Sequence, residues 1–325
     1  MAHRPASPGT GGGGGYPRAV RSDHTTDPGE VDVSVVLPVY NERGHLLAEI
    51  DRIRQALEGS SYSYEIVVVD DGSTDGSGDR LRALDGIRLI SFPRNRGSGS
   101  ARKAGSFAAR GRVVVWTDAD MTYPNDRIPE LVKELEGHDQ VVGARTSEQG
   151  TAKALRVPAK WAIRMLAQYL AGVKIPDLNS GLRAFRRSVA VQYLHLLPAG
   201  FSCVTTITMA FLANGYSVRY VPIEYRPRAG ESKFHWWKDT RRYLLQVVRL
   251  VLSYNPLKVF LPLGLTLLAV GMAKLGFDLV DKDWRVGSNT SLLLFAAFQV
   301  IAIGLLADLV VRVTKPRDEV GPASL

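Results

Sequence analysis

Two long apolar segments near the C-terminus constrain the fold of this chain more than any other sequence feature. Residues 257–277 and 291–311 are apolar almost throughout, and their charged residues, Lys258, Lys274 and Asp308, lie close to the segment ends. About 20 apolar residues cross the hydrocarbon core of a bilayer. Each segment is apolar on all sides rather than along one stripe, which disfavours the alternative of two helices buried in a soluble core. The sequence therefore predicts a transmembrane helical hairpin.

Basic residues flank this hairpin on both sides. Before the first span they are Lys233, Lys238, Arg241, Arg242, Arg249 and Lys258, and after the second they are Arg312, Lys315 and Arg317. Because lysine and arginine are enriched on the cytoplasmic side of membrane proteins, both ends of the hairpin and the rest of the chain are predicted to be cytoplasmic. The net charge of +9 fits a membrane surface or a phosphorylated substrate. A nucleic-acid partner is not expected, because no nucleic-acid-binding motif accompanies the charge.

The part of the chain before the hairpin has the pattern of an α/β domain. Apolar runs typical of strands occupy Val33–Val39, Tyr64–Val69, Ile87–Phe92, Val113–Trp116 and Gln140–Val142, and they alternate with helix-like segments. Continuous apolar strands indicate a mostly parallel, Rossmann-like sheet that is covered by helices on both faces. In such sheets ligands bind at the carboxyl ends of the strands. The single cysteine, Cys203, excludes an intramolecular disulfide and is interpreted as a core residue.

Two acids stand at the end of one predicted strand. Asp118 and Asp120 follow Val113–Trp116 closely and are separated by Ala119. Carboxylates two residues apart on a strand-end loop can converge on one divalent cation, and hard oxygen ligands suit Mg²⁺ or Mn²⁺. Such a cation can neutralise the charge of a departing diphosphate. The pair therefore predicts a metal-assisted reaction of a diphosphate compound.

Two further motifs fall at the ends of predicted strands. Asp70 and Asp71 close the second strand in the run V-V-V-D-D-G-S-T-D, where a carboxylate can accept hydrogen bonds from a base or a ribose. The alternative for Asp71 and Ser73 is simple capping of the following helix. At the end of the first strand, the run L-P-V-Y-N-E at 37–42 offers an aromatic ring and a carboxylate. Together these motifs predict ligand contacts at the same edge of the sheet as the acid pair.

These three motifs, in this order and spacing, resemble those of a family 2 glycosyltransferase with a GT-A fold. The resemblance extends over roughly residues 32–235, and the apolar hairpin narrows it to the dolichol-phosphate mannose synthase-like branch, which includes bacterial polyprenyl-phosphate glycosyltransferases. The resemblance implies inverting transfer of one hexose from a GDP- or UDP-linked donor to a polyprenyl phosphate, either dolichyl or undecaprenyl. The implied cofactor is Mg²⁺ or Mn²⁺.

The resemblance also implies roles for individual residues near the donor. Contacts to the nucleotide are expected from Pro38, Tyr40, Glu42, Val69 and Asp71. Asp118, Ala119 and Asp120 are expected to surround the diphosphate and its metal. Relatives often carry a glutamine where this chain has Thr122, so Thr122 is the expected third protein ligand of the metal.

Residues later in the chain are expected at the sugar and the phosphates. The resemblance places Arg145 and Ser180 at the acceptor phosphate and Asp177 beside the sugar as a catalytic residue. Arg228 and Lys233 lie in a segment that closes on the donor diphosphate in relatives, although Arg226 is an alternative to Arg228. Arginine forks match phosphate oxygens, and lysine supplies a point charge. The alternative for the basic residues is a patch attracted to anionic lipid.

The sequence divides into five regions. They are a disordered tail (1–30), the catalytic domain (31–234), an interfacial amphipathic helix (235–255), the transmembrane hairpin (256–313) and a cytoplasmic tail (314–325). The interfacial helix is predicted because aromatic, basic and aliphatic residues are mixed within it, as in helices that lie on a membrane surface.

Two other functions are compatible with parts of the pattern. A processive polysaccharide synthase shares the donor-binding motifs, but it typically carries Q-x-x-R-W, whereas Leu250 follows the run Q-V-V-R here. A catalytically silent membrane adaptor would not need the intact acid pair. The sequence leaves open the sugar, the choice of UDP or GDP, the polyprenol length and whether the chain forms a homo-oligomer.

Overall fold

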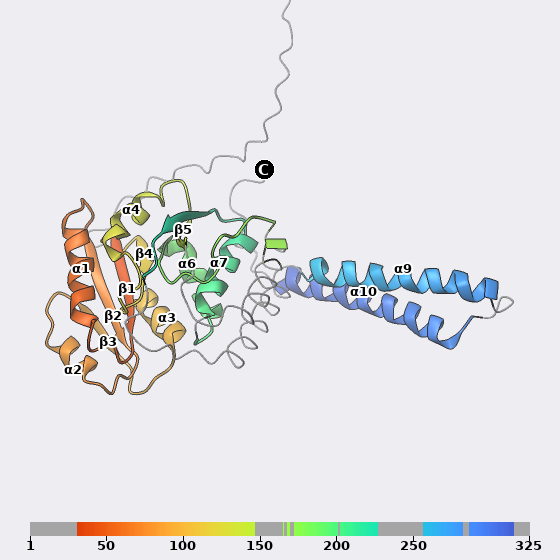
Figure 1. Cartoon of the computed structure of the whole chain (residues 1–325), viewed down its shortest axis with the longest axis horizontal. Coiled ribbons are helices and arrows are strands. Elements are labelled where there is room, and N and C mark those ends of the chain that lie inside the picture. The colour runs from red at the N-terminus through yellow and green to blue at the C-terminus, as the bar shows by residue number, and fades with distance from the viewer. Residues whose placement is uncertain are drawn as a thin grey trace, which may run out of the picture. The chain divides into compact units, whose positions relative to one another are not determined.

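The computed structural model describes residues 31–146, 165, 168–169, 172–200, 202–226, 256–281 and 286–314 (Figure 1). Several predictions lie outside these residues. They concern the tail 1–30, most of a predicted helix at 161–170, the interfacial helix 235–255, the tail beyond 314, and the site residues Arg228 and Lys233.

A mixed sheet of seven strands forms the centre of the α/β domain, in the order β3-β2-β1-β4-β6-β5-β7. The strands are β1 (Val33–Val39), β2 (Tyr64–Asp70), β3 (Arg88–Ser91), β4 (Val113–Trp116), β5 (Gln140–Arg145), β6 (Arg183–Arg186) and β7 (Val218–Ile223). The first four neighbours in this order run parallel, as do β5 and β7. Among the described strands, β6 alone is antiparallel to both of its neighbours, β4 and β5. The predicted mostly parallel sheet is confirmed, with β6 as the unpredicted exception.

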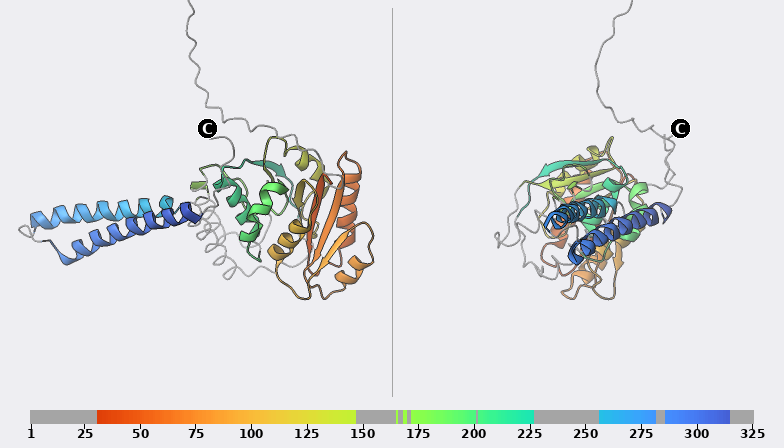
Figure 2. Two further views of the ribbon diagram at one scale, coloured as in Figure 1. Left: turned by 180° about the vertical axis from the view of Figure 1, so that it is seen from behind. Right: turned by 90° about the vertical axis from the view of Figure 1, so that its right-hand side faces the viewer.

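Helices cover both faces of this sheet (Figure 1 and Figure 2). They are α1 (Leu46–Glu58), α2 (Ser77–Arg82), α3 (Ser98–Ala108), η1 (Asn125–Arg127), α4 (Ile128–Lys133), α6 (Arg187–Tyr193), η2 (Leu194–Leu196) and α7 (Cys203–Ala213). Successive residues of β1 point to opposite faces, so Val35 joins the core under α1 and α4, whereas Val36 joins the core under α3 and α7. Cys203 is buried in the second core, as predicted.

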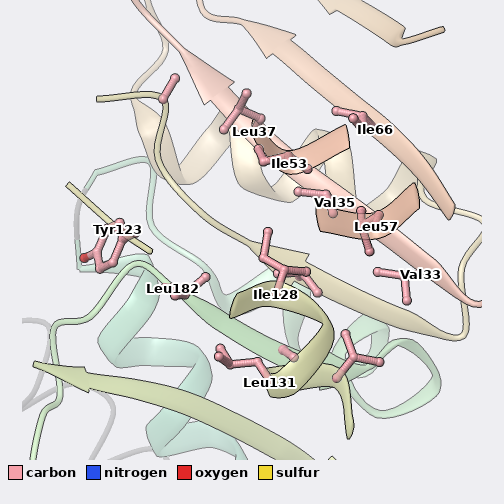
Figure 3. Close-up of a cluster of buried hydrophobic side chains, with 14 of the residues drawn as sticks. Val33, Val35, Leu37, Ile53, Leu57, Ile66, Tyr123, Ile128, Leu131 and Leu182 are labelled. Carbon is pink, nitrogen blue, oxygen red and sulfur yellow. The ribbon is translucent and has the colours of Figure 1, made fainter. Parts of the chain in front are cut away.

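Helix α1 shows how the sequence pattern forms this core. Its apolar residues Leu46, Ile50, Ile53 and Leu57 recur every three or four positions, which places them on one face of a helix. All four side chains are fully buried, and they pack with β1 and β2 in the core drawn in Figure 3. This packing holds α1 against the sheet, and with it the loop that leads from the C-terminal end of β1 into α1.

The two apolar segments form long helices, α9 (Leu257–Asp281) and α10 (Ser288–Thr314). Both are long and apolar enough to cross a membrane, and only 11% of the most apolar window of each is buried. They pack closely on each other, since a Cβ added at Gly264 would lie 2.4 Å from a side-chain atom of Ile301. Each helix extends past the predicted span at the connection. There the buried Asp278 carboxylate accepts hydrogen bonds from the Gly287 N–H, at 3.1 Å, and from the Thr290 hydroxyl.

Candidate functional site

The loops that carry the candidate residues leave the carboxyl ends of β1, β2, β4 and β5. Two non-glycine residues in these loops, Asn41 and Met121, have the left-handed φ angles of 56° and 62°. This conformation costs roughly 1–2 kcal/mol for a residue with a side chain. Such strain persists where the surroundings enforce it, and it is concentrated at functional sites. Met121 lies directly between Asp120 and Thr122, so the strain falls within the acid-pair loop.

Asp118 is held by a buried arginine that the sequence did not identify. The guanidinium of Arg102, on α3, forms an ion pair with Oδ1 of Asp118. The Arg102 side chain is 2% exposed, whereas that of Asp118 is 30% exposed. A Cβ added at Gly181 would lie 2.6 Å from Oδ2 of Asp118, so the loop before β6 packs against this carboxylate. Asp118 thus contacts the protein interior on one side and remains partly open to solvent.

Asp120 is more enclosed than Asp118, with 8% of its surface exposed. Its Oδ1 accepts hydrogen bonds from the hydroxyl of Thr122, at 2.5 Å, and from the Thr122 N–H, at 3.3 Å. Thr122 itself is fully buried. Its hydroxyl proton is directed at Asp120, so Thr122 orients this acid; its role as a metal ligand stays a prediction.

The acid pair fits a divalent cation, both in the type of ligand atom and in the number of carboxylates. Mg²⁺ is typically bound through one or two carboxylates, with substrate phosphates and water completing the coordination. Asp118 and Asp120 supply such carboxylates, and both follow β4 within one short loop. Among the described residues, no group of three or more His, Cys, Asp or Glu side chains gathers as in a metal cage built wholly from protein. The remaining ligands would therefore come from substrate and water.

Asp71 fixes the loop that precedes α3. The residue is 2% exposed, and its carboxylate accepts hydrogen bonds from the N–H groups of Arg96, at 2.7 Å, and Gly97, at 2.8 Å. Burial raises the pKa of Asp71 even though these two donors favour its charged form. The alternative of helix capping is wrong, because α2 begins at Ser77 and Asp75 accepts the Ser77 N–H instead.

The other residues predicted at the nucleotide lie close to Asp71 in the sheet. Pro38 and Val39 pair with Val69 and Asp70 in the register of β1 and β2. Pro38, Tyr40 and Glu42 are half-buried, whereas the Val69 side chain is fully buried and lies against Gly105 of α3. The fold therefore brings this predicted group together at one strand edge, although its contacts with a nucleotide stay a prediction.

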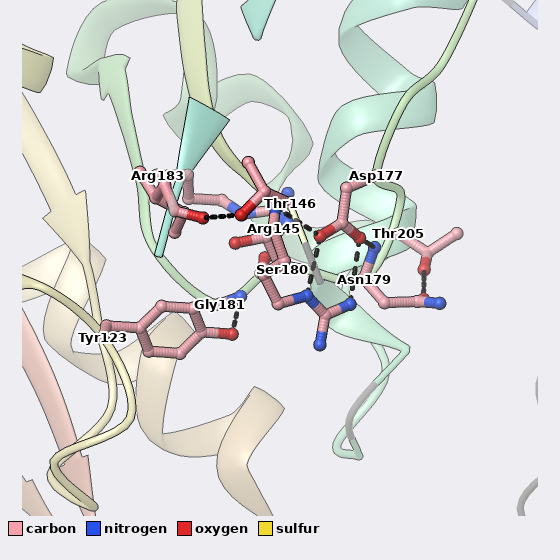
Figure 4. A network of polar contacts seen from close by, with 10 residues as sticks. Tyr123, Arg145, Thr146, Asp177, Asn179, Ser180, Gly181, Arg183 and Thr205 are labelled. Atoms are coloured by element: carbon pink, nitrogen blue, oxygen red, sulfur yellow. Dashed lines mark hydrogen bonds and ion pairs between the residues drawn. The ribbon is translucent and has the colours of Figure 1, made fainter. Parts of the chain in front are cut away.

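Arg145 and Asp177, 32 residues apart in the chain, form a bidentate ion pair (Figure 4). Arg145 Nε and one terminal nitrogen lie 2.7 and 3.0 Å from the two carboxylate oxygens. The carboxylate also accepts the N–H groups of Asn179, at 2.9 Å, and of Arg145, at 3.2 Å. Burial acts to raise the pKa of Asp177, but the guanidinium outweighs it and holds this pKa below its ordinary value.

Ser180 lies in the same loop as Asp177. Two residues that the sequence did not identify, Tyr123 and Arg183, form hydrogen bonds with the backbone of this loop. The Tyr123 hydroxyl accepts the Gly181 N–H at 2.6 Å. Arg183, fully buried, donates to the carbonyls of Ser180 and Val204 and to the Thr208 hydroxyl. Burial lowers the pKa of Arg183 to about 10. The Ser180 hydroxyl oxygen is buried and has no hydrogen-bond partner within the described part of the chain.

One of the missed residues did leave a signal in the sequence. Gly99, Ala101, Gly105 and Ser106 are small residues on the buried face of α3, and Arg102 falls among them. A basic residue within a stripe of small residues indicates a buried charge that needs a partner. Arg183 left no comparable signal, because it follows a loop and begins a short strand.

Comparison with known families identifies two regions of the chain. Residues 34–194 match the model of glycosyl transferase family 2, and residues 255–313 match the GtrB C-terminal hairpin. The first match contains the candidate site residues from Pro38 to Arg183, and the second contains α9 and most of α10.

Relatives with named activities match nearly the whole chain. An undecaprenyl-phosphate 4-deoxy-4-formamido-L-arabinose transferase of Aeromonas hydrophila is 30% identical over 86% of this chain and 88% of its own length. A dodecaprenyl-phosphate galacturonate synthase of Rhizobium johnstonii is 28% identical over 92% of this chain and 93% of its own.

Among solved structures, glucosyl-3-phosphoglycerate synthase from Mycobacterium tuberculosis in complex with uridine diphosphate has a similar fold. The TM-score is 0.55 at 23% identity, and the alignment covers 69% of this chain and 81% of that one. The same enzyme in complex with Mn²⁺, uridine diphosphate and phosphoglyceric acid also aligns with a TM-score of 0.55. At this level of identity the likeness shows the GT-A-like fold alone.

Proposed function

The chain belongs to glycosyl transferase family 2, and on that premise we propose that it transfers one sugar from a nucleotide-sugar to a polyprenyl phosphate at the cytoplasmic face of a membrane. The names of its relatives support the acceptor, because both describe transfer to, or synthesis on, a polyprenyl phosphate. Neither name describes a polymer, so single transfer is favoured over processive synthesis. The observation that carries the proposal is the presence in one chain of the acid pair after β4 and two helices of membrane-spanning length.

Asp118 and Asp120 are the residues that would hold Mg²⁺ or Mn²⁺ at the donor diphosphate. When bound, the cation supplies positive charge that stabilises the nucleoside diphosphate as it leaves. Asp71 keeps the loop before α3 in place at the nucleoside end, with Pro38, Tyr40, Glu42 and Val69 in neighbouring positions. The sugar would then lie between the acid pair and the loop that contains Asp177 and Ser180.

Arg145 is suited to receive the acceptor phosphate. Its Nε and one terminal nitrogen are engaged by Asp177, while its other terminal nitrogen has no hydrogen-bond partner among the described residues. The ion pair fixes the plane of the guanidinium, and a fixed guanidinium binds phosphate oxygens with little loss of conformational freedom. The uncommitted nitrogen of Arg145 would thus bind the anionic acceptor. A contact from Ser180 would require its loop to move, because the Ser180 side chain is fully buried.

The reaction then requires no strong general base from the protein. The second pKa of a phosphate monoester is about 6, so the acceptor oxygen is already anionic at neutral pH. Direct attack on the anomeric carbon would invert its configuration. Asp177 is bonded by Arg145 and by two N–H groups, so its part is to position Arg145 rather than to accept a proton. The residues mainly bring two anionic substrates together and offset their repulsion.

The hairpin accounts for access to such an acceptor. A polyprenyl chain is insoluble in water, so its phosphate is presented at the membrane surface. Basic residues flank the hairpin, which favours a cytoplasmic catalytic domain.

The test is to incubate membranes that contain this protein with labelled UDP- and GDP-sugars and undecaprenyl or dolichyl phosphate, and then to identify the labelled lipid. One donor is expected to give a single-sugar lipid phosphate, and EDTA is expected to prevent its formation. A labelled polymer, or no labelled lipid with any donor while the purified protein remains folded, would contradict the proposal.

A further inference from the structure

Of the two fully buried arginines among the described residues, Arg102 and Arg183, Arg102 has an ionic partner that belongs to the candidate site. We propose that Arg102 is a positioning residue of the diphosphate site, which holds Asp118 in the orientation that the acid pair needs. Through α3 it also links that orientation to the nucleoside end of the site. This inference rests on the proposed function, because it assigns Asp118 to the donor diphosphate.

The contacts of Arg102 favour this role over a purely structural one. Within the described residues, its guanidinium donates to Oδ1 of Asp118 and to the sulfur of Cys203, at 3.8 Å, which is a weak acceptor. It also lies over the ring of Trp116, with 5.8 Å between the guanidinium carbon and the ring centroid. Its Nε has no hydrogen-bond partner among the described residues. Asp118 is therefore its one strong partner in that part of the chain.

Arg183 provides an internal contrast. It is just as buried, but its guanidinium donates to three neutral oxygens, two from backbone carbonyls and one from Thr208. These bonds join the Ser180 loop to α7, which is a structural task. Arg102 makes no comparable set of bonds within the described residues. A buried ion pair contributes little net stability compared with well-packed apolar residues, so packing alone does not explain an arginine at this position.

Helix α3 packs tightly against its neighbours, so its residues keep fixed positions relative to one another and to the sheet. A Cβ added at Gly99 would lie 2.0 Å from the carbonyl oxygen of Pro198, and one at Gly105 would lie 2.4 Å from Cγ1 of Val36. The helix is thus in close contact with a loop at its beginning and with β1 near its end. The Asp71 carboxylate binds the N–H groups of Arg96 and Gly97 just before the helix begins.

One helix therefore connects two acids from different strands. Asp71 follows β2 and holds the beginning of α3, while Asp118 follows β4 and is held by Arg102, one turn further along the helix. Displacement of α3 would move both contacts together. Outer partners that orient a metal-binding carboxylate typically change metal affinity or activity by about 10- to 100-fold when they are removed.

The test compares four forms of the full-length protein in detergent: wild type, Arg102→Met, Arg102→Lys and Lys103→Met. Lys103→Met is the matched control, because it removes a positive charge from the next position of α3. Calorimetry measures binding of Mn²⁺ together with UDP, and of Mn²⁺ together with GDP. We expect Arg102→Met to weaken the binding of the accepted pair by about 10- to 100-fold. Arg102→Lys is expected to weaken it less, and Lys103→Met to leave it unchanged.

The double variant Arg102→Met with Asp118→Asn separates positioning from direct contact. If Arg102 acts through Asp118, the double variant binds the metal–nucleotide pair as weakly as Asp118→Asn alone. If the double variant instead binds more weakly than Asp118→Asn, by the same factor that Arg102→Met causes alone, the inference is overturned. If Arg102→Met does not fold, as judged by thermal unfolding, the comparison of Arg102→Lys with Lys103→Met decides in the same way.

The two proposals fail in different ways. Wild-type protein that binds neither metal–nucleotide pair would remove the basis of the proposed function. If the wild-type protein binds a metal–nucleotide pair and both Arg102 variants bind it equally well, only the proposed role of Arg102 is overturned.

Discussion

The two aspartate–arginine pairs at the strand ends differ in how completely the carboxylate is bonded. Asp177 accepts both prongs of the Arg145 fork and two backbone N–H groups, and its side chain is 9% exposed. Asp118 accepts from one arginine, Arg102, and its side chain is 30% exposed. The first carboxylate is saturated by the protein, and the second keeps capacity for a ligand.

This difference indicates separate tasks for two acids that look alike in sequence. A saturated carboxylate contributes to the stability of its loop and fixes its arginine, whereas an incompletely bonded one at the surface of the site can bind a cation. Matched substitutions of the two acids should therefore differ in their effect on metal-dependent activity.

The largest expected effect is on activity, in Asp118→Asn. The variant keeps an acceptor oxygen for Arg102 but loses the charge that a divalent cation requires. We expect the rate of sugar transfer to fall by about 10²- to 10³-fold, which corresponds to the several kcal/mol supplied by a bound metal. Because the buried Arg102 would lose its charged partner, the thermal unfolding midpoint is expected to fall as well, so the rate is compared per amount of folded protein. An active variant with wild-type dependence on metal would show that the comparison assigns the wrong task to Asp118.

The next effect is on stability, in Asp177→Asn. Arg145 would lose a charged partner in a site where its side chain is only 15% exposed. Loss of hydrogen bonds to a charged group costs roughly 1.5–3 kcal/mol. Thermal unfolding in detergent should therefore show a clear decrease for this variant. A wild-type midpoint would contradict the bonding described for Asp177.

Lowering the pH provides a further test of the Asp177–Arg145 ion pair. The folded-state pKa of Asp177 lies below its unfolded value, so its contribution is present above the ordinary aspartate pKa of about 3.9 and is lost as the pH falls through the folded value. The difference in unfolding midpoint between wild type and Asp177→Asn should shrink as the pH falls from 6 toward about 3. A difference that is constant across this range would exclude the ion pair as its source.

The smallest effect concerns Glu49, a fully buried acid on α1. Its Oε1 accepts from the Asn125 side chain at 2.5 Å, and its Oε2 has no hydrogen-bond partner among the described residues. Burial raises its pKa above the ordinary value, so the ionised form costs stability as the pH rises through the folded-state value. Glu49→Gln should raise the unfolding midpoint slightly at neutral pH and not at acid pH. A lower midpoint at neutral pH would contradict this sign.

The strand ends and the acid motifs were predictable from the sequence because each depends on local pattern. The run Val33–Val39 and the run Val113–Trp116 have the bounds of β1 and β4, since their apolar residues are continuous and end at polar loops. The antiparallel direction of β6 was not predictable, because four residues between a loop and a helix carry no signal of orientation. The extension of α9 to Asp281 depends on polar bonds at the connection, which lie beyond the apolar run.

The partners of the charged residues required the structure. The sequence identified Arg145 and Asp177 as site residues but placed them at different substrates, and nothing in a single sequence indicates that they bind each other. The stripe of small residues around Arg102 indicates a buried charge, but it does not indicate which acid this charge binds. Thr122 was expected as a ligand by position, whereas its hydroxyl is directed at Asp120.

The most direct test of the account is the formation of labelled lipid by wild type and by Asp118→Asn in matched membranes, each with Mn²⁺ or with EDTA. We expect wild-type protein with Mn²⁺ to form a polyprenyl-phosphate sugar, Asp118→Asn with Mn²⁺ to form it about 10²- to 10³-fold more slowly, and neither protein to form it in EDTA. Labelled lipid from wild-type protein in EDTA, or equal rates for the two proteins with Mn²⁺, would exclude the metal role of Asp118.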